Sequence, residues 1–204
     1  MYKGEKINSI SHLVGASLSL AGWVLLIVFS SLTGDPWKIV GCTIYGFSLF
    51  FMYLFSTLYH SFKGKAKRVF QIFDHIAIYI LIAGTYTPIT LVTLRGKMGW
   101  NIFGLVWGIA VVGTIFKTAW TGKFDRISTA FYVLAGWTIL IDISELYEKF
   151  PRDGFYWIFA GGVLYTIGAF FYLRDSLKRN HEIWHFFVLG ASICHYVAIF
   201  FYLI

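Results

Sequence analysis

Two histidines lie four residues apart in the stretch N-H-E-I-W-H, which begins at Asn180 and ends at His185. Residues at this spacing share one face of a helix, so His181 and His185 would project their imidazole rings in the same direction. Neutral imidazole nitrogens are good zinc ligands, and the helix fixes the distance between them. The pair supplies only half of a metal site, and the remaining ligands must come from other segments.

Three more polar residues stand in or beside apolar segments. His60 ends one segment, Ser56 precedes it by four residues on the same helical face, and Asp74 begins the next segment. Catalytic zinc takes three protein ligands and leaves one position for water, whose pKa falls toward about 7 on the metal. We therefore expect His60, His181 and His185 to hold Zn²⁺. Asp74 would act as the general base, and Ser56 would donate a hydrogen bond to a substrate carbonyl oxygen.

The composition places these residues in a membrane protein. Of the 204 residues, 58% are hydrophobic and only 13% are charged, which is too little polar surface for a soluble domain of this length. The chain breaks into apolar runs of about 17 to 25 residues, the length that crosses a hydrocarbon core as a helix. We place seven such runs at 10–32, 37–62, 70–94, 99–117, 127–144, 154–173 and 183–204. We expect an all-α integral membrane protein, a seven-transmembrane helix bundle, with residues 1–204 forming a single domain because the connections are short.

The basic residues predict the orientation. Twelve of the 17 Lys and Arg residues fall at the N-terminus and in the second, fourth and sixth connections, and Lys117 is counted among the loop charges. The positive-inside rule then places the N-terminus in the cytoplasm and the C-terminus outside, in a multi-pass protein of the plasma membrane. The net charge of +7 requires no nucleic acid, since the basic connection 63–68 either faces anionic lipid or is a solvated loop.

On this map His60, Asp74, His181 and His185 share one level at the cytoplasmic side. Ionisable side chains within membrane helices are costly, and they normally face the bundle interior and mark a functional site. The alternative is that each histidine only satisfies hydrogen bonds between helices. Three separate segments that deliver such residues to one level favour the metal site.

The other histidines carry smaller expectations. His195 lies about 15 Å deeper than His185 at 1.5 Å per residue, too far to bind the same ion, and is expected to be a hydrogen-bonded core residue. His12 begins the first helix on the same side of the membrane, but it belongs to no motif and is not counted among the site residues. His75 points about 100° away from Asp74 on an ideal helix, so it would face another helix or tune the carboxylate.

Two further features concern the helices themselves. Cys42 and Cys194 fall at different depths, so no disulfide is expected between them. Pro88 removes a backbone hydrogen bond near the outer end of the third helix and should kink or end it.

Four segments together resemble the signature segments of the hemolysin III family, the bacterial members of the progestin and adipoQ receptor (PAQR) superfamily. They are F-S-T-L-Y-H ending at His60, F-D-H-I-A-I-Y around Asp74, A-G-T-Y-T-P ending at Pro88, and H-E-I-W-H. The resemblance covers nearly the whole chain. It implies a seven-helix fold with a cytoplasmic N-terminus and a buried zinc bound by histidines that match His60, His181 and His185.

In the same family, the acidic residue and the serine of the motif match Asp74 and Ser56. The wider grouping includes alkaline ceramidases, which suggests zinc-dependent hydrolysis of a lipid amide. The family name records a cytolytic activity, and some bacterial members are associated with membrane homeostasis.

A metalloprotease is a competing interpretation, because His181 to His185 also matches H-E-x-x-H with Glu182 as the general base. No further ligand motif follows His185. Glu182 is better interpreted as an acid in the first turn of a helix, where it suits the positive end of the helix dipole.

The sequence therefore predicts a zinc-dependent hydrolase of a lipid-like amide or ester that enters from the bilayer. The apolar walls and the absence of a charged group to clamp the substrate favour a membrane lipid as substrate or ligand. Two alternatives stay open. One is a receptor-like sensor with structural zinc, and the other is a hemolysin III-type cytolysin or membrane-homeostasis factor without turnover. The oligomeric state is not defined by the sequence.

Overall fold

The computed structural model describes residues 4–204, which are helical over most of their length. The helices are α1 (Lys6–Leu32), α2 (Pro36–Ser61), α3 (Gly64–Pro88), α4 (Lys97–Trp120), α5 (Asp125–Gly136), α6 (Ile143–Lys149), α7 (Arg152–Tyr172) and α8 (Asn180–Tyr202). A π-helical turn (Ile89–Thr93) continues α3, and a 3₁₀ helix (Thr138–Asp142) joins α5 to α6. Seven segments are long and apolar enough to cross a membrane, with α5 and α6 forming one of them. The predicted all-α seven-helix fold is confirmed.

The helix boundaries follow from local chemistry. Apolar runs of this length form helices because every backbone N–H and C=O must find a partner within its own segment when water is absent. The tight turn before α2 contains Gly34, whose φ of 69° suits a residue without a Cβ. Asp35 then caps α2, since its Oδ1 accepts a hydrogen bond from the Trp37 backbone N–H at 2.8 Å. Pro36 follows at the first helical position, where its missing N–H costs nothing.

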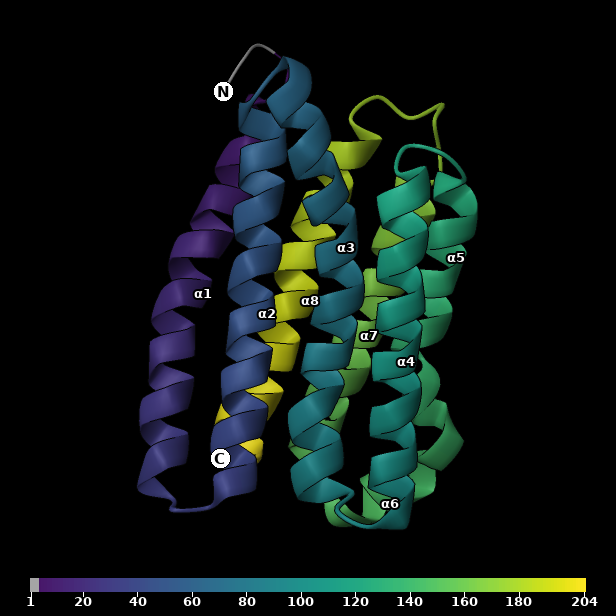
Figure 1. The fold of residues 1–204 in the computed structure, drawn as a ribbon. Coiled ribbons are helices and arrows are strands. Elements are labelled where there is room, and N and C mark those ends of the chain that lie inside the picture. Colours follow the sequence, from purple (N-terminus) through teal and green to yellow (C-terminus); the bar gives the residue numbers. More distant parts are fainter. Residues whose placement is uncertain (1–3) are drawn as a thin grey trace.

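The arrangement of the helices brings the last one into the interior. In Figure 1, α8 lies behind α2 and α3, and it packs against α7 and α1. The two ends of the chain lie at opposite ends of the bundle, as an odd number of crossings requires (Figure 1). The N-terminal ends of α1, α3 and α8 and the C-terminal end of α2 therefore meet at the same end of the bundle.

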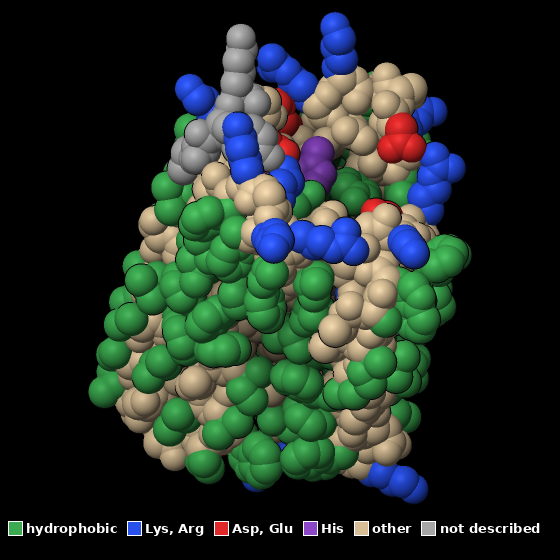
Figure 2. Space-filling model, turned by 45° about the horizontal axis from the view of Figure 1, so that its top comes forward, with side chains coloured by type: hydrophobic (Ala, Val, Ile, Leu, Met, Phe, Trp, Pro, Cys, Tyr) green, Lys and Arg blue, Asp and Glu red, His purple; other side chains and the backbone are tan. Residues whose placement is uncertain are grey.

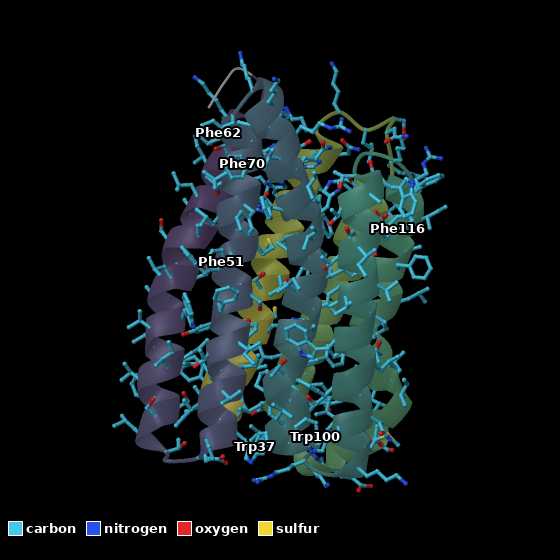
Figure 3. The ribbon with its side chains drawn as sticks, in the orientation of Figure 1. Trp37, Phe51, Phe62, Phe70, Trp100 and Phe116 are labelled. Atoms are coloured by element: carbon cyan, nitrogen blue, oxygen red, sulfur yellow. The ribbon has the colours of Figure 1, made fainter. Side chains whose placement is uncertain are left out.

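Charged side chains gather at that end, which we call the basic end. It holds the loops after α2, α4 and α7, and its exposed basic residues include Lys63, Lys65, Arg68, Lys123, Arg126, Arg174, Lys178 and Arg179. Figure 2 shows these blue side chains around the top of the molecule, while hydrophobic side chains cover its flank. At the opposite end, the rings of Trp37 and Trp100 lie 5.7 Å apart (Figure 3). An apolar belt between a charged end and a pair of tryptophans fits a bilayer-spanning bundle.

Small residues let the helices approach closely. A Cβ on Gly15 would lie 2.6 Å from the Tyr53 ring, and a Cβ on Gly22 would lie 2.8 Å from the Tyr196 ring. Both distances are too short for any larger residue. Glycine at these positions therefore allows α1 to pack tightly against α2 and α8.

Two of the membrane-spanning segments contain a break in the α-helix, one after Pro88 and one after Gly136. After Pro88, α3 changes to the π-helical turn and then ends, in agreement with the kink or stop expected there. The fifth segment was predicted as one helix over 127–144, and this is wrong because it breaks after Gly136. The Tyr86 hydroxyl donates to the Gly136 carbonyl at 2.8 Å and accepts from the Ile139 backbone N–H at 2.7 Å. A side chain from α3 thus replaces hydrogen bonds that a continuous helix would make.

We predict that Tyr86→Phe destabilises the protein without altering its fold. The substitution leaves the Ile139 N–H and the Gly136 carbonyl without this partner, at a cost of about 1–3 kcal/mol in the free energy of unfolding. The measurement is the melting temperature in detergent. Tyr147→Phe is the control, because Tyr147 is 39% exposed and removal of its hydroxyl should leave the melting temperature unchanged. Equal melting temperatures for both variants would show that the hydroxyl of Tyr86 does not support the break.

Candidate metal centre

Three imidazoles from two helices meet at the basic end. His60 lies in the last turn of α2, and His181 and His185 lie in the first turns of α8. One ring nitrogen of each lies within 4.8 Å of the others, and the Nε2 atoms of His60 and His181 are 3.2 Å apart. A tetrahedral zinc ion with bonds of about 2.0–2.1 Å separates two ligand nitrogens by about 3.4 Å. The spacing of these nitrogens therefore fits a single metal ion.

The remaining ring nitrogens of two of these histidines are held by α1. His60 Nδ1 donates to Glu5 Oε2 at 2.6 Å. His185 Nδ1 donates to the Asn8 carbonyl at 3.2 Å and lies 3.3 Å from Ser11 Oγ. Since a carboxylate and a carbonyl can only accept, both rings carry their proton on Nδ1 and leave Nε2 with its lone pair. Metal-ligating histidines commonly donate their second nitrogen in this way, so the contacts fit a metal site.

Glu5 is the centre of a small charged network at the start of α1. Its carboxylate also accepts from Lys67 Nζ at 2.7 Å and from Asn8 Nδ2 at 3.1 Å. Burial opposes its ionisation, but the hydrogen bonds from Lys67, Asn8 and His60 outweigh burial and lower the pKa of Glu5 from 4.5 to about 2. Glu5 is therefore a carboxylate at any physiological pH, and its bond to His60 is charge-assisted.

A fourth histidine lies against the centre. The His12 ring stacks on the His185 ring with centroids 3.6 Å apart and an angle of 11° between the planes. Its side chain is buried, and neither ring nitrogen has a hydrogen-bond partner within residues 4–204. His12 thus lies beside the site, although no motif indicated it, and it fixes the plane of the His185 ring by stacking.

Two of the three imidazoles, those of His181 and His185, open onto a cavity in the bundle with a volume of about 130 Å³. His181 and His185 line its wall together with Ser56 and Asp74. The Ser56 hydroxyl hydrogen-bonds to the Asp74 carboxyl group. Away from this polar end the wall is mostly apolar and includes Met52, Leu81, Ile82, Val133, Trp137 and Val188. The arrangement joins a candidate metal centre and a carboxylate to an apolar chamber in the membrane region.

The structure also places the lesser candidates. His195 Nε2 donates to the Ile158 carbonyl at 3.1 Å, so this deep histidine is hydrogen-bonded as expected. His75 lines the cavity, and its Nδ1 is buried with no hydrogen-bond partner in the described part of the chain. Glu182 does not line the cavity, and its carboxylate faces Arg179 with 3.6 Å between Oε2 and Nε. Cys42 and Cys194 are both free.

Lys117 requires a correction. The sequence placed it at the end of the fourth apolar run, counted it among the charges of the next connection, and gave no charged group to clamp a substrate. In the structure α4 extends past Lys117 to Trp120, and the Lys117 side chain is 1% exposed and lines the cavity. Its Nζ lies 2.9 Å from Asp125 Oδ1, at the start of α5. A charged pair therefore faces the chamber that was expected to be apolar.

Sequence reasoning missed the contribution of α1. Glu5, Asn8 and Ser11 support two of the three imidazoles, yet none of them belongs to a metal-ligand motif. One signal was available, because Glu5, Asn8 and Ser11 recur every three positions at the start of an apolar helix, and His12 stands four positions after Asn8. Polar residues at that spacing share one face, which must turn toward polar partners inside the bundle.

Comparison with known proteins agrees with this architecture. The family model described as "Haemolysin-III related" matches residues 1–196. The chain is 45% identical to "Hemolysin-3" of Bacillus cereus over 99% of this chain and 93% of that protein. It is 41% identical to "Hemolysin-3 homolog" of Bacillus subtilis (strain 168) over 98% and 94%.

More distantly, the chain is 28% identical to "Monocyte to macrophage differentiation factor" of Homo sapiens over 84% of this chain and 74% of that protein. No solved structure matches the chain. The family match and the two close relatives extend over nearly the whole chain, as do the seven candidate membrane helices. The chain therefore belongs to the haemolysin III-related family of multi-pass membrane proteins, within the PAQR superfamily.

Proposed function

We propose that this protein is a zinc-dependent hydrolase that cleaves an amide or ester bond of a membrane lipid. The observation that carries the proposal is that three histidine nitrogens lie within 4.8 Å of one another and that two of these histidines share a cavity wall with Asp74. The N-terminus of this hydrolase lies in the cytoplasm, so the reaction takes place near the inner surface of the membrane.

The donor set supports zinc as the metal. Imidazole nitrogens suit zinc, and three protein ligands leave one tetrahedral position for water or substrate. Glu5 and Asn8 hold His60 and His185 in the tautomer that presents Nε2. A zinc ion held there supplies a Lewis acid and lowers the pKa of water, which is the chemistry that hydrolysis at neutral pH requires.

The residues around the open position have separate tasks. Asp74 accepts the proton of the attacking water and later returns it to the leaving group. Ser56 holds the Asp74 carboxyl group through its hydroxyl, which makes Ser56 a positioning residue. The Ser56 hydroxyl has one proton and cannot donate to the Asp74 carboxyl group and to the substrate carbonyl oxygen at the same time. Its role as donor to the substrate therefore stays a prediction.

The apolar chamber accounts for the substrate class. An acyl chain from the bilayer packs against Met52, Leu81 and Val188 without leaving an apolar environment, because these side chains are as apolar as the lipid tails around it. The polar end of the same chamber then receives the bond to be cleaved. The walls also exclude bulk water from the reacting groups, which strengthens their electrostatic interactions.

A cytolysin is the second candidate, because relatives carry the printed name "Hemolysin-3". The two functions differ in whether they need the histidines. A hydrolase needs all three, whereas lysis by membrane insertion depends on the apolar belt. Release of dye from liposomes by a variant with His60, His181 and His185 all replaced by alanine would favour the cytolysin.

We predict that the protein purified without chelators contains about one equivalent of zinc, held by three histidines. His60→Ala, His181→Ala and His185→Ala should each reduce the zinc content below about half an equivalent, since two imidazoles hold the ion poorly. Metal analysis by mass spectrometry gives the readout. The control is His195→Asn. This variant changes a histidine far from the proposed ligands, and the protein should keep its zinc. Zinc retained in all three alanine variants would rule out this ligand set.

We predict that Asp74→Asn abolishes hydrolysis while the zinc stays bound. Loss of a general base should lower kcat by about 10²–10⁴-fold. Ser56→Ala should lower kcat by less, because water can take its place at Asp74. Release of fatty acid from a panel of amide and ester lipids is measured beside the zinc content. Full turnover with Asp74→Asn would exclude Asp74 as the base.

We predict that Glu5→Gln weakens zinc binding by about 10–100-fold, as expected for loss of a carboxylate behind a metal-bound histidine. Competition with a chelator gives the apparent Kd. Glu182→Gln is the matched control, since it removes one negative charge at the same end of the bundle and should change neither Kd nor turnover. Loss of turnover in Glu182→Gln would instead support the H-E-x-x-H protease.

A further inference from the structure

The cavity wall holds a buried lysine, paired with a partly exposed aspartate, that the proposed reaction does not use. Lys117 on α4 is 1% exposed, and its ammonium group pairs with the Asp125 carboxylate at 2.9 Å. Both residues line the cavity that contains Asp74, His181 and His185. Burying an ammonium group in the membrane region is costly, and such residues usually mark a site for a polar or charged ligand.

The pair leaves hydrogen-bonding capacity on the cavity side. An ammonium group has three N–H donors, and within residues 4–204 the Lys117 ammonium has one acceptor, Asp125 Oδ1. Asp125 is 38% exposed, so its charge is partly solvated from outside the cavity. Two donors of a buried cation thus remain to bind a ligand.

A second polar group points to the same conclusion. His75 also lines the cavity, and its Nδ1 is buried without a hydrogen-bond partner in the described residues. The position of its backbone is fixed, because the Tyr132 hydroxyl donates to the His75 carbonyl at 3.0 Å. A buried ring nitrogen without a partner costs stability unless a ligand or water satisfies it.

The charges favour an anionic ligand. The two unused donors of Lys117 suit the oxygens of a carboxylate or a phosphate, and charge-assisted hydrogen bonds of this kind are strong. The mouth of the bundle at the basic end carries exposed Lys and Arg side chains, which raise the local concentration of anions (Figure 2). An uncharged headgroup could accept hydrogen bonds from Lys117, but it would gain neither the attraction between opposite charges nor the raised local concentration.

We propose that Lys117 and His75 form a headgroup subsite that binds an anionic group at the polar end of the lipid in the cavity. The subsite deepens the proposed hydrolase and rests on it for the substrate class, a lipid amide or ester, to which it adds an acidic headgroup. The acyl chain occupies the apolar chamber, and Lys117 binds the anionic oxygen of the headgroup. Lys117 is a specificity-determining residue.

The test is a binding experiment that needs no turnover. The full-length protein in lipid nanodiscs is titrated with N-oleoyl-4-aminobutyrate and with its uncharged methyl ester, and empty nanodiscs correct for partitioning. Mass spectrometry checks that each probe stays intact. The wild-type protein should bind the carboxylate at least about tenfold more tightly than the ester, as a charge-assisted hydrogen bond to a buried cation requires. A phosphate probe, N-oleoylethanolamine phosphate, tells which anion is preferred.

Variants assign the preference to the ion pair. Lys117→Met combined with Asp125→Asn removes both charges together, so no unpaired charge stays buried. This double variant should bind the carboxylate and the ester with about equal affinity. Lys117→Arg should keep it. The matched control, Arg126→Met combined with Asp175→Asn, removes an exposed ion pair at the same end, whose side chains are 77% and 74% exposed. This control should bind both probes as the wild type does.

Two results would overturn the subsite. One is equal affinity of the wild-type protein for the carboxylate and the ester. This measurement does not depend on whether any variant folds. The other is an unchanged preference in the folded double variant, which would make the ion pair purely structural. The proposed hydrolase fails separately, if no lipid is cleaved while the preference for the anion persists.

Discussion

The structure depends on the cost of burying imidazole nitrogens where no water can reach them. Each ring has two nitrogens, and each nitrogen lacks a partner unless the protein or a ligand supplies one. His60 and His185 each receive one partner from α1, through Glu5 and the Asn8 carbonyl. One ring nitrogen of each of these two histidines lies within 4.8 Å of a ring nitrogen of His181. A metal ion satisfies three such nitrogens at once, which no single hydrogen-bonding side chain can do.

This constraint decides how α1, α2 and α8 must pack. The Asn8 carbonyl reaches His185 only if the first turns of α1 lie against α8, and Glu5 reaches His60 only if they also lie against α2. Gly15, one turn beyond Ser11, allows this approach because the Tyr53 ring occupies the place where a side chain would be. The Tyr53 hydroxyl in turn donates to the Val188 carbonyl of α8 at 3.4 Å. The packing of three helices and the geometry of the centre are therefore parts of one arrangement.

The fold was predictable from the sequence because a membrane permits little else. Uninterrupted apolar runs of this length must form helices, and all seven candidate spans of the structure coincide with predicted runs. The three histidines were predictable because motif spacing and depth in the membrane can both be read from the sequence. The partners of these histidines were not, since Glu5 and Asn8 act through contacts between distant segments. The burial of Lys117 was not predictable, because the apolar run ends at this residue whereas α4 continues for about another turn and Lys117 is buried.

The break in the fifth segment was also hidden, because its cause lies on another helix. Tyr86, Gly136 and Trp137 all line the cavity, so the interrupted backbone borders the chamber. Irregular backbone at membrane depth is stable only where protein groups or a cavity satisfy its polar atoms. The Tyr86 hydroxyl does this at the break, and Trp137 Nε1 donates to Thr166 Oγ1 at 2.9 Å to tie the same turn to α7. A continuous helix would need neither contact. The break therefore belongs to the chamber, because Gly136 and Trp137 at the irregular turn form part of the wall against which an acyl chain would lie.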